Sequence, residues 1–223
     1  MFRNFKAKIE QAVDRSGGHP SVVVTHSFGG ILFKWMLHSG GIDEYWIKKH
    51  VSRWICVSCP WGGSSSSLLT ATSGDFYLPM FHRTFKDELN MNGAMIACLP
   101  NKLGYNPSQT LMYVGDSRKI SCKDYHDLGL KDKFVAFEIW KDLYEPYLDM
   151  LMQPIPIHTH IVRTDHLDTP DSYFLKTLDD YPSRMEYTSG DGVVPNRSLL
   201  AYKKLLIPNM TRDMVVPFSD HTG

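Results

Sequence analysis

Residues 22–31 have the sequence Val-Val-Val-Thr-His-Ser-Phe-Gly-Gly-Ile, in which an apolar run meets a serine and two glycines. The short apolar run predicts a buried strand, and the apolar-periodic residues 31–37 predict a helix. Ser27 then occupies a strand-to-helix turn, a nucleophile elbow, which projects the serine hydroxyl over the end of a sheet. Small residues suit positions 29 and 30, where strand and helix backbones approach each other. The elbow points to acyl chemistry at Ser27, with Thr25 in place of the first glycine of G-x-S-x-G.

Composition narrows the classes of protein to which the chain can belong. The chain has 223 residues, of which 43% are hydrophobic, enough to bury the core of one domain. Lys+Arg and Asp+Glu are equal at 24 each. The sequence has no run of basic residues of the kind that binds along the phosphates of a nucleic acid. No stretch approaches the roughly 20 apolar residues that span a bilayer. The first ten residues alternate charged and apolar side chains, unlike a signal peptide. Nucleic acid is therefore not an expected partner.

The four cysteines are too few for a disulfide scaffold. Cys56 and Cys59 fall inside an apolar strand pattern, where thiols are typical of a core. We expect them to be buried core residues and not a redox pair.

Strand and helix patterns alternate along both ends of the chain and predict an α/β fold with a parallel sheet and helices on both faces. The predicted helices are 2–15, 31–37, 42–50 and one around 68–69, and the predicted strands are 22–24, 54–57, 157–162 and 214–216. The serine tract 64–67 is expected to cap the helix that follows it. The continuous apolar run at 22–24 is typical of a central strand that is paired on both sides, but with no strand before it to pair with we expect it to become an edge of the sheet. From 76 to 152 the alternation breaks down, which predicts an insertion.

These patterns divide the chain into three parts. Residues 1–75 are predicted to hold the first part of the core with the elbow, 76–152 the insertion, and 153–223 the rest of the core with the acid and histidine loops.

A serine hydroxyl needs a neighbouring base, and that base needs a carboxylate to hold its tautomer. Two loops near the C-terminus can supply them: Asp191 lies between two glycines after the third predicted strand, and His221 follows the fourth. The predicted chain order is Ser27, Asp191, His221. The order nucleophile, acid, histidine is the one that α/β-hydrolases use.

Each assignment has an alternative. Asp191 is also a common turn residue, and His221 alone is typical of a surface histidine. The competing acids are Asp165, Asp168 and Asp171, in the loop expected after the third strand, and the competing bases are His158, His160 and His166. His26 is next to the serine, but its side chain is expected to pack away from the site.

Several segments, in the same order, resemble the lecithin:cholesterol acyltransferase family, which includes lysosomal phospholipase A and the phospholipid:diacylglycerol acyltransferases. The resemblance spans nearly the whole chain, and its most specific segments are Pro60-Trp61-Gly62-Gly63 and Gly190-Asp191-Gly192-Val193-Val194-Pro195. The other similar segments are 26–29, 46–51, 71–75, 123–125 and 168–174.

The resemblance implies an α/β-hydrolase fold in which 76–152 forms part of a cap. It implies that Ser27 takes an acyl group from a phospholipid and passes it to a sterol, a diacylglycerol, another alcohol or water. His221 would be the base, Asp191 would orient it, and the backbone N–H of Phe28 would donate to the oxyanion. No cofactor and no metal are expected.

The α/β-hydrolase fold builds strands before the elbow strand, and we expect those N-terminal strands to be missing from this chain. The second oxyanion donor and the segment that contacts a lipid surface are expected to be missing with them. The resemblance suggests the secretory pathway, the endoplasmic reticulum, the lysosome or secretion, although the chain shows no signal peptide or transmembrane segment. The alternatives are a general lipase or esterase of the same fold, and a non-catalytic truncated member of the family.

Overall fold

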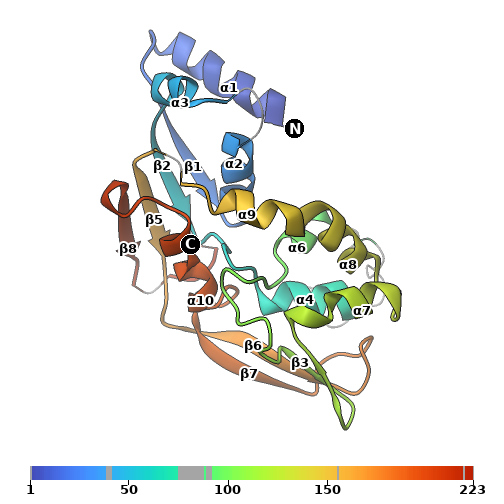
Figure 1. Cartoon of the computed structure of the whole chain (residues 1–223). Coiled ribbons are helices and arrows are strands. Elements are labelled where there is room, and N and C mark those ends of the chain that lie inside the picture. The colour runs from blue at the N-terminus through green and yellow to red at the C-terminus, as the bar shows by residue number, and fades with distance from the viewer. Residues whose placement is uncertain are drawn as a thin grey trace.

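The computed structural model describes residues 2–38, 42–74, 88, 92–154, 156–217 and 219–222. These residues form an α/β structure with two four-stranded sheets (Figure 1). The first sheet lies beside the N-terminal helices, and the second lies at the far end of the molecule from α1.

The first sheet is parallel and has the strand order β1-β2-β5-β8. Its strands are β1 (Ser21–His26), β2 (Val51–Val57), β5 (Thr159–Arg163) and β8 (Thr211–Val215). All four predicted strands are therefore present and lie in one sheet in chain order. Because the strands are parallel, the segments that follow β1 and β8 leave from the same edge of the sheet.

Helices connect these strands as predicted. The helices that precede β1 or lie between the strands of the first sheet are α1 (Phe2–Arg15), α2 (Phe28–His38), α3 (Glu44–His50), α4 (Ser65–Ser73) and α10 (Asn196–Leu199), followed by the 3₁₀ turns η5 (Leu200–Lys204) and η6 (Pro208–Met210). Asp43 caps α3 by accepting the N–H of Trp46. The predicted serine cap is confirmed, since the Ser64 side chain accepts from Ser66 N. Gly74, in a left-handed conformation, ends α4.

The second sheet has the order β4-β3-β6-β7. Its strands are β3 (Met112–Val114), β4 (Arg118–Ile120), β6 (Leu167–Leu175) and β7 (Arg184–Gly190). β3 and β6 are parallel, and the other two pairs are antiparallel. The prediction of a loop at 165–171 is wrong for Asp168 and Asp171, because both lie in β6.

The predicted insertion contributes β3 and β4 to this second sheet, in which β3 pairs with β6. Residues 75–87, 89–91 and 155 lie outside the described part of the chain. The rest of the segment consists mainly of short helical elements, which are α6 (Gly93–Ala97), η2 (Cys122–Asp124), α7 (Tyr125–Leu130), α8 (Val135–Ile139), η3 (Trp140–Tyr144), η4 (Glu145–Tyr147) and α9 (Leu148–Leu151). Tyr125 packs against the rings of Phe137 and Trp140, which gives these helices a shared aromatic core.

β1 is an edge strand, as predicted. Among the described residues it pairs with β2 alone and forms an edge of the sheet. Val22 and Val24 are 53% and 64% exposed, whereas Val23 and Thr25 are buried. Within the described residues the apolar run thus lies at an edge of the sheet, as expected.

The elbow helix α2 lies very close to the first sheet at one point. A Cβ atom on Gly30 would lie 2.5 Å from Cys59 Sγ and 2.9 Å from Cys56 Sγ. A Cβ atom on the neighbouring Gly29 would lie 3.7 Å from Thr25 Cβ, an ordinary contact. Cys56 and Cys59 are buried free thiols, which confirms their predicted place in the core.

α2 also carries a buried cation, Lys34, with an exposed fraction of 0%. Lys34 Nζ donates to the backbone oxygens of Gln153 (3.0 Å) and Leu205 (2.9 Å). These bonds join α2 to the end of α9 and to the segment after η5. Burial lowers the pKa of Lys34 to about 8, because the charged form loses hydration, and the nearby Cys59 partly opposes this shift.

We expect Gly30→Ala to lower the free energy of unfolding by about 1–3 kcal/mol, because the added methyl group overpacks a site closed by two thiols. Gly29→Ala is the matched control and should be neutral or stabilising by up to about 1 kcal/mol, since alanine favours a helix. Urea unfolding followed by circular dichroism measures both. Equal effects of the two substitutions would contradict the close packing at Gly30.

We expect the stability of the wild type relative to Lys34→Met to rise with pH between about 8 and 10.5. In this window the native protein has lost the Lys34 proton and the unfolded chain retains it, so folding releases a proton and higher pH favours folding. The free energy of unfolding of the wild type, relative to that of the variant, should rise by up to about 1.4 kcal/mol per pH unit. Urea unfolding of both proteins from pH 7.5 to 10.5 measures it.

The comparison with the variant is needed because buried thiols act in the opposite direction. Burial raises the pKa of Cys98 to about 12, so above pH 9 the native state retains a proton that the unfolded chain loses. Both proteins share this loss of stability, and their difference isolates Lys34. Parallel pH curves would contradict a lowered Lys34 pKa.

Candidate active site

Ser27 forms the predicted elbow between β1 and α2. Its φ of 52° lies in the left-handed region, which residues with a side chain rarely adopt. Ser27 N donates to Val57 O of the neighbouring strand β2 (2.8 Å), and Gly30 N donates to Ser27 O (3.0 Å). The turn is therefore fixed from both sides by backbone hydrogen bonds.

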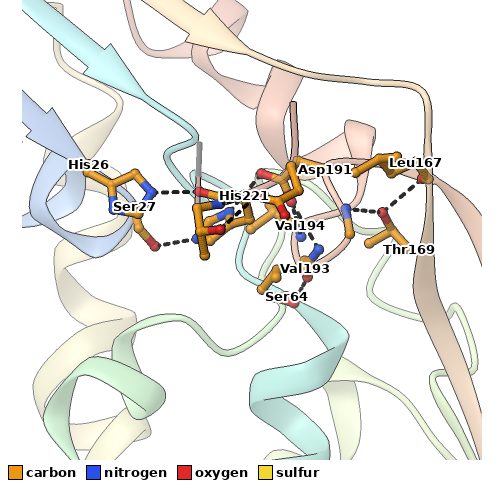
Figure 2. A network of polar contacts seen from close by, with 12 residues as sticks. His26, Ser27, Ser64, Leu167, Thr169, Asp191, Val193, Val194 and His221 are labelled. Atoms are coloured by element: carbon orange, nitrogen blue, oxygen red, sulfur yellow. Dashed lines mark hydrogen bonds and ion pairs between the residues drawn. The ribbon is translucent and has the colours of Figure 1, made fainter. Parts of the chain in front are cut away.

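Ser27, His221 and Asp191 lie in one chain of contacts (Figure 2). His221 Nε2 is 2.9 Å from Ser27 Oγ, and His221 Nδ1 is 2.8 Å from Asp191 Oδ2. The three side chains come from the end of β1, the turn after β8 and the loop after β7. The structure thus brings together three residues that were selected from chain order and from their positions after predicted strands.

The Asp191 carboxylate is completely buried, at 0% exposure. Its Oδ1 accepts the backbone N–H groups of Val193 (3.0 Å) and Val194 (2.7 Å), and its Oδ2 faces His221. An ionised carboxylate only accepts hydrogen bonds, so the proton of a neutral His221 lies on Nδ1. Nε2 is then free to accept from the hydroxyl of Ser27, the arrangement that a general base requires.

The loop that carries Asp191 is held by neighbouring elements. Gly192, with φ 92°, donates its N–H to Thr169 Oγ1 (2.9 Å) on β6. Ser64 Oγ donates to Val193 O (2.7 Å), so the residue that caps α4 also fixes this loop. A Cβ atom on Gly190 would lie 2.4 Å from Val194 O. The sequence indicated Ser64 only as a cap and gave no signal for Thr169.

The competing acids have other partners. Asp165 accepts from Arg163 (2.9 Å), and Asp171 accepts from Arg197 (2.8 Å). Burial raises the pKa of Asp171, and the positive charge of Arg197 partly opposes that shift. Asp168 lies in the pairing of β6 with β7. It is Asp191 that His221 Nδ1 contacts.

The competing histidines lie on or beside β5. His160 is within β5, with its Nε2 3.4 Å from Arg53 Nη1, and His158 precedes that strand. His166 Nδ1 is 2.8 Å from Thr164 Oγ1. The histidine that reaches the serine hydroxyl is His221.

The expectation that His26 packs away from the site is wrong. His26 Nε2 lies 2.7 Å from the backbone oxygen of His221, and the two rings are 5.1 Å apart. The reason is that the turn carrying His221 comes to lie against the exposed end of the edge strand β1.

Thr25, which stands where the elbow motif has a glycine, is accommodated by its neighbours. Its Oγ1 accepts the indole N–H of Trp54 (2.8 Å), whose ring is completely buried. A threonine here satisfies a buried donor that a glycine would leave without this partner.

Phe28 begins α2, so its backbone N–H belongs to the first turn, where N–H groups lack acceptors within the helix. This group follows Ser27 directly, in the position expected of an oxyanion donor. No group of three or more His, Cys, Asp or Glu side chains suited to a metal occurs among the described residues. Within the same residues, no helix has the length and apolar character to cross a membrane.

The parallel sheet and the elbow define an α/β-hydrolase-like protein. The model of the lecithin:cholesterol acyltransferase family matches residues 1–117, which is more than half of the chain. The protein therefore belongs to the lecithin:cholesterol acyltransferase family.

Relatives in animals and plants agree with this assignment. The chain is 25% identical over 205 residues to the "lysosomal phospholipase A and acyltransferase" of Canis lupus familiaris and 23% identical to that of Homo sapiens, and each match covers 89% of this chain and 48% of the relative. It is 24% identical over 215 residues to "lecithin-cholesterol acyltransferase-like 1" of Arabidopsis thaliana, covering 91% of this chain and 47% of the relative. The chain thus spans about half the length of the curated relatives it matches.

Proposed function

We propose that this protein is a serine-dependent O-acyltransferase or phospholipase that acts on glycerolipids through an acyl-serine intermediate. The observation that carries this proposal is the continuous contact from Ser27 Oγ through His221 to the buried Asp191. The names of the relatives, phospholipase A and acyltransferase, support the same chemistry.

In the first step, His221 Nε2 accepts the Ser27 proton as Oγ attacks the ester carbonyl of a lipid. The negative charge of Asp191 stabilises the imidazolium that forms. The backbone N–H of Phe28 donates to the developing oxyanion. The imidazolium then gives its proton to the leaving alcohol, and the acyl group remains on Ser27.

In the second step, His221 takes a proton from the acceptor, whose oxygen attacks the acyl-serine. Water gives a free fatty acid, and an alcohol such as a sterol or a diacylglycerol gives a new ester. Return of the proton to Ser27 Oγ restores the enzyme. His221 and Ser27 carry the protons in this sequence, while Asp191 orients His221 and stabilises its charged form without taking a proton.

Two apolar grooves beside the elbow helix support the proposal that the substrate carries long hydrocarbon chains. One, of about 480 Å³, is lined by residues that include Phe5, Val24 and Leu32. The other, of about 610 Å³, shares Leu32 and includes Trp35 and Tyr147. Both lie along α2, which begins at the residue after Ser27.

We also propose that the segment 76–152 is part of a cap over the acyl site. The described residues that support this role lie at its C-terminal end, where Tyr147 lines the larger groove. Tyr144 packs against Trp35 of α2, with ring centroids 5.2 Å apart. A lysosomal or secretory location is proposed from the names of the animal relatives.

We expect Ser27→Ala to lower kcat by about 10⁶, the scale of loss when the nucleophile of a serine triad is removed. Release of a labelled acyl chain from a phospholipid, with and without an alcohol acceptor, measures turnover and separates transfer from hydrolysis. A fluorophosphonate probe should label Ser27 in the wild type. Ser219→Ala, which removes a half-buried hydroxyl two residues before His221, is the control and should leave both readings unchanged. Labelling of another serine, with Ser27→Ala still active, would overturn the proposal.

We expect Asp191→Asn to lower kcat by about 10⁴ with the fold intact. An asparagine can still accept the loop N–H groups through its oxygen, but its NH₂ group would face His221 Nδ1 and favour the wrong tautomer. Asp168→Asn on β6 makes the same chemical change outside the contact with His221 and should have little effect. The opposite ranking in the phospholipid assay would show that the acid is misassigned.

A further inference from the structure

His26 lies beside the backbone of His221. It is the last residue of β1, and its Nε2 is 2.7 Å from the His221 backbone oxygen. A carbonyl oxygen has no proton to give, so His26 Nε2 must be the donor. The two imidazole rings are also in contact, with their centroids 5.1 Å apart and an interplanar angle of 50°.

The turn that carries His221 follows the end of β8. After the strand, Val216 N still donates to Arg163 O (2.8 Å). Within the turn, Asp220 Oδ1 accepts the backbone N–H and the hydroxyl of Thr222 (2.8 and 2.6 Å), which shapes the turn locally. The bond from His26 ties the main chain of this turn to the first sheet.

His221 is consequently held at three atoms. Asp191 binds Nδ1, Ser27 lies at Nε2, and His26 binds the backbone oxygen (Figure 2). If the backbone of His221 were free to shift, rotation about its side-chain torsions would let the ring keep its contact with Asp191 while Nε2 moves away from Ser27 Oγ. With the backbone and Nδ1 both fixed, the position of Nε2 is determined.

We propose that His26 is a positioning residue that holds the backbone of His221 so that its Nε2 stays within reach of Ser27 Oγ. This inference rests on the proposed roles of Ser27 and His221. His26 and Ser27 are consecutive, so the anchor of the base and the nucleophile belong to one rigid strand end. Proton transfer requires heavy atoms about 2.6–3.2 Å apart, and a misplacement of about 1 Å can cost 10²-fold in rate.

Three substitutions separate the hydrogen bond from the ring contact. His26→Gln retains an N–H donor, His26→Phe retains a ring without a donor, and His26→Leu has neither. We expect His26→Gln to keep kcat within about threefold of the wild type. His26→Leu and His26→Phe should lower kcat by about 10- to 100-fold. Because His26 also lines the smaller groove, the readout for this bond is kcat and not KM.

The matched control is His19, an exposed histidine that precedes the opposite end of β1. His19→Leu and His19→Gln make the same changes two residues before the start of the same strand, away from His221. Both should leave kcat and KM at wild-type values.

A second measurement does not depend on turnover. In the ¹H spectrum of protein labelled with ¹⁵N-histidine, the Nδ1–H proton of His221, bonded to Asp191, should be shifted downfield and protected from exchange. The signal should persist in His26→Gln and be lost to exchange in His26→Leu and His26→Phe. Failure of the proposed function would appear separately, as activity that survives Ser27→Ala.

Loss of kcat and of the His221 signal in the leucine and phenylalanine variants, with rescue by glutamine, would support the inference. Wild-type kcat with an unchanged signal in His26→Leu would overturn it. Equal losses in the glutamine and leucine variants, with equally lowered free energies of unfolding, would also overturn it, because they would assign His26 a merely structural role.

Discussion

The left-handed backbone at Ser27 is the constraint on which the site depends. A residue with a side chain in this conformation costs about 1–3 kcal/mol and persists only when its surroundings fix it. Here the hydrogen bond from Ser27 N to Val57 O fixes the strand side, and the packing of Gly30 on two thiols fixes the helix side. The serine hydroxyl is therefore held in place by the packing of α2 on the first sheet.

The second sheet holds part of the candidate site in place. β7 ends at Gly190 and delivers Asp191, while Thr169 on β6 holds the loop at Gly192. Ser64 at the start of α4 fixes the same loop from another side. Asp191 is thus positioned by elements outside the parallel sheet, and Ser27 and His221 by strands within it.

Local patterns in the sequence predicted the elements of the parallel sheet and the three residues of the proposed triad. Local patterns could point to these residues because an elbow, an Asp-Gly turn and a histidine after a strand are each visible within a few residues. They failed at β6, where Pro170 and Asp171 are residues that strands usually avoid. The register of β6 against β7 shifts between Pro170 and Ser172, an irregularity at which a proline is tolerated.

The missed contacts join residues far apart in the chain. His26 meets His221 across 195 positions, and the partners of Lys34 lie 119 and 171 positions away. Periodicity assigns a residue to a face of its own helix or strand, but it does not say which distant segment covers that face.

The thiols under the elbow helix have a consequence for oxidative chemistry. The thiolate is the reactive form of cysteine, and burial raises the pKa of Cys59 well above its usual value. Cys56 and Cys59 are thus out of reach of solutes, and Cys59 is also held protonated, as long as Gly30 rests on them. Oxidants reach these sulfur atoms only when α2 separates from the sheet. The same separation disrupts the turn at Ser27. Damage to these sulfur atoms would therefore accumulate in molecules that have already lost the geometry of the site, and the folded population would be spared.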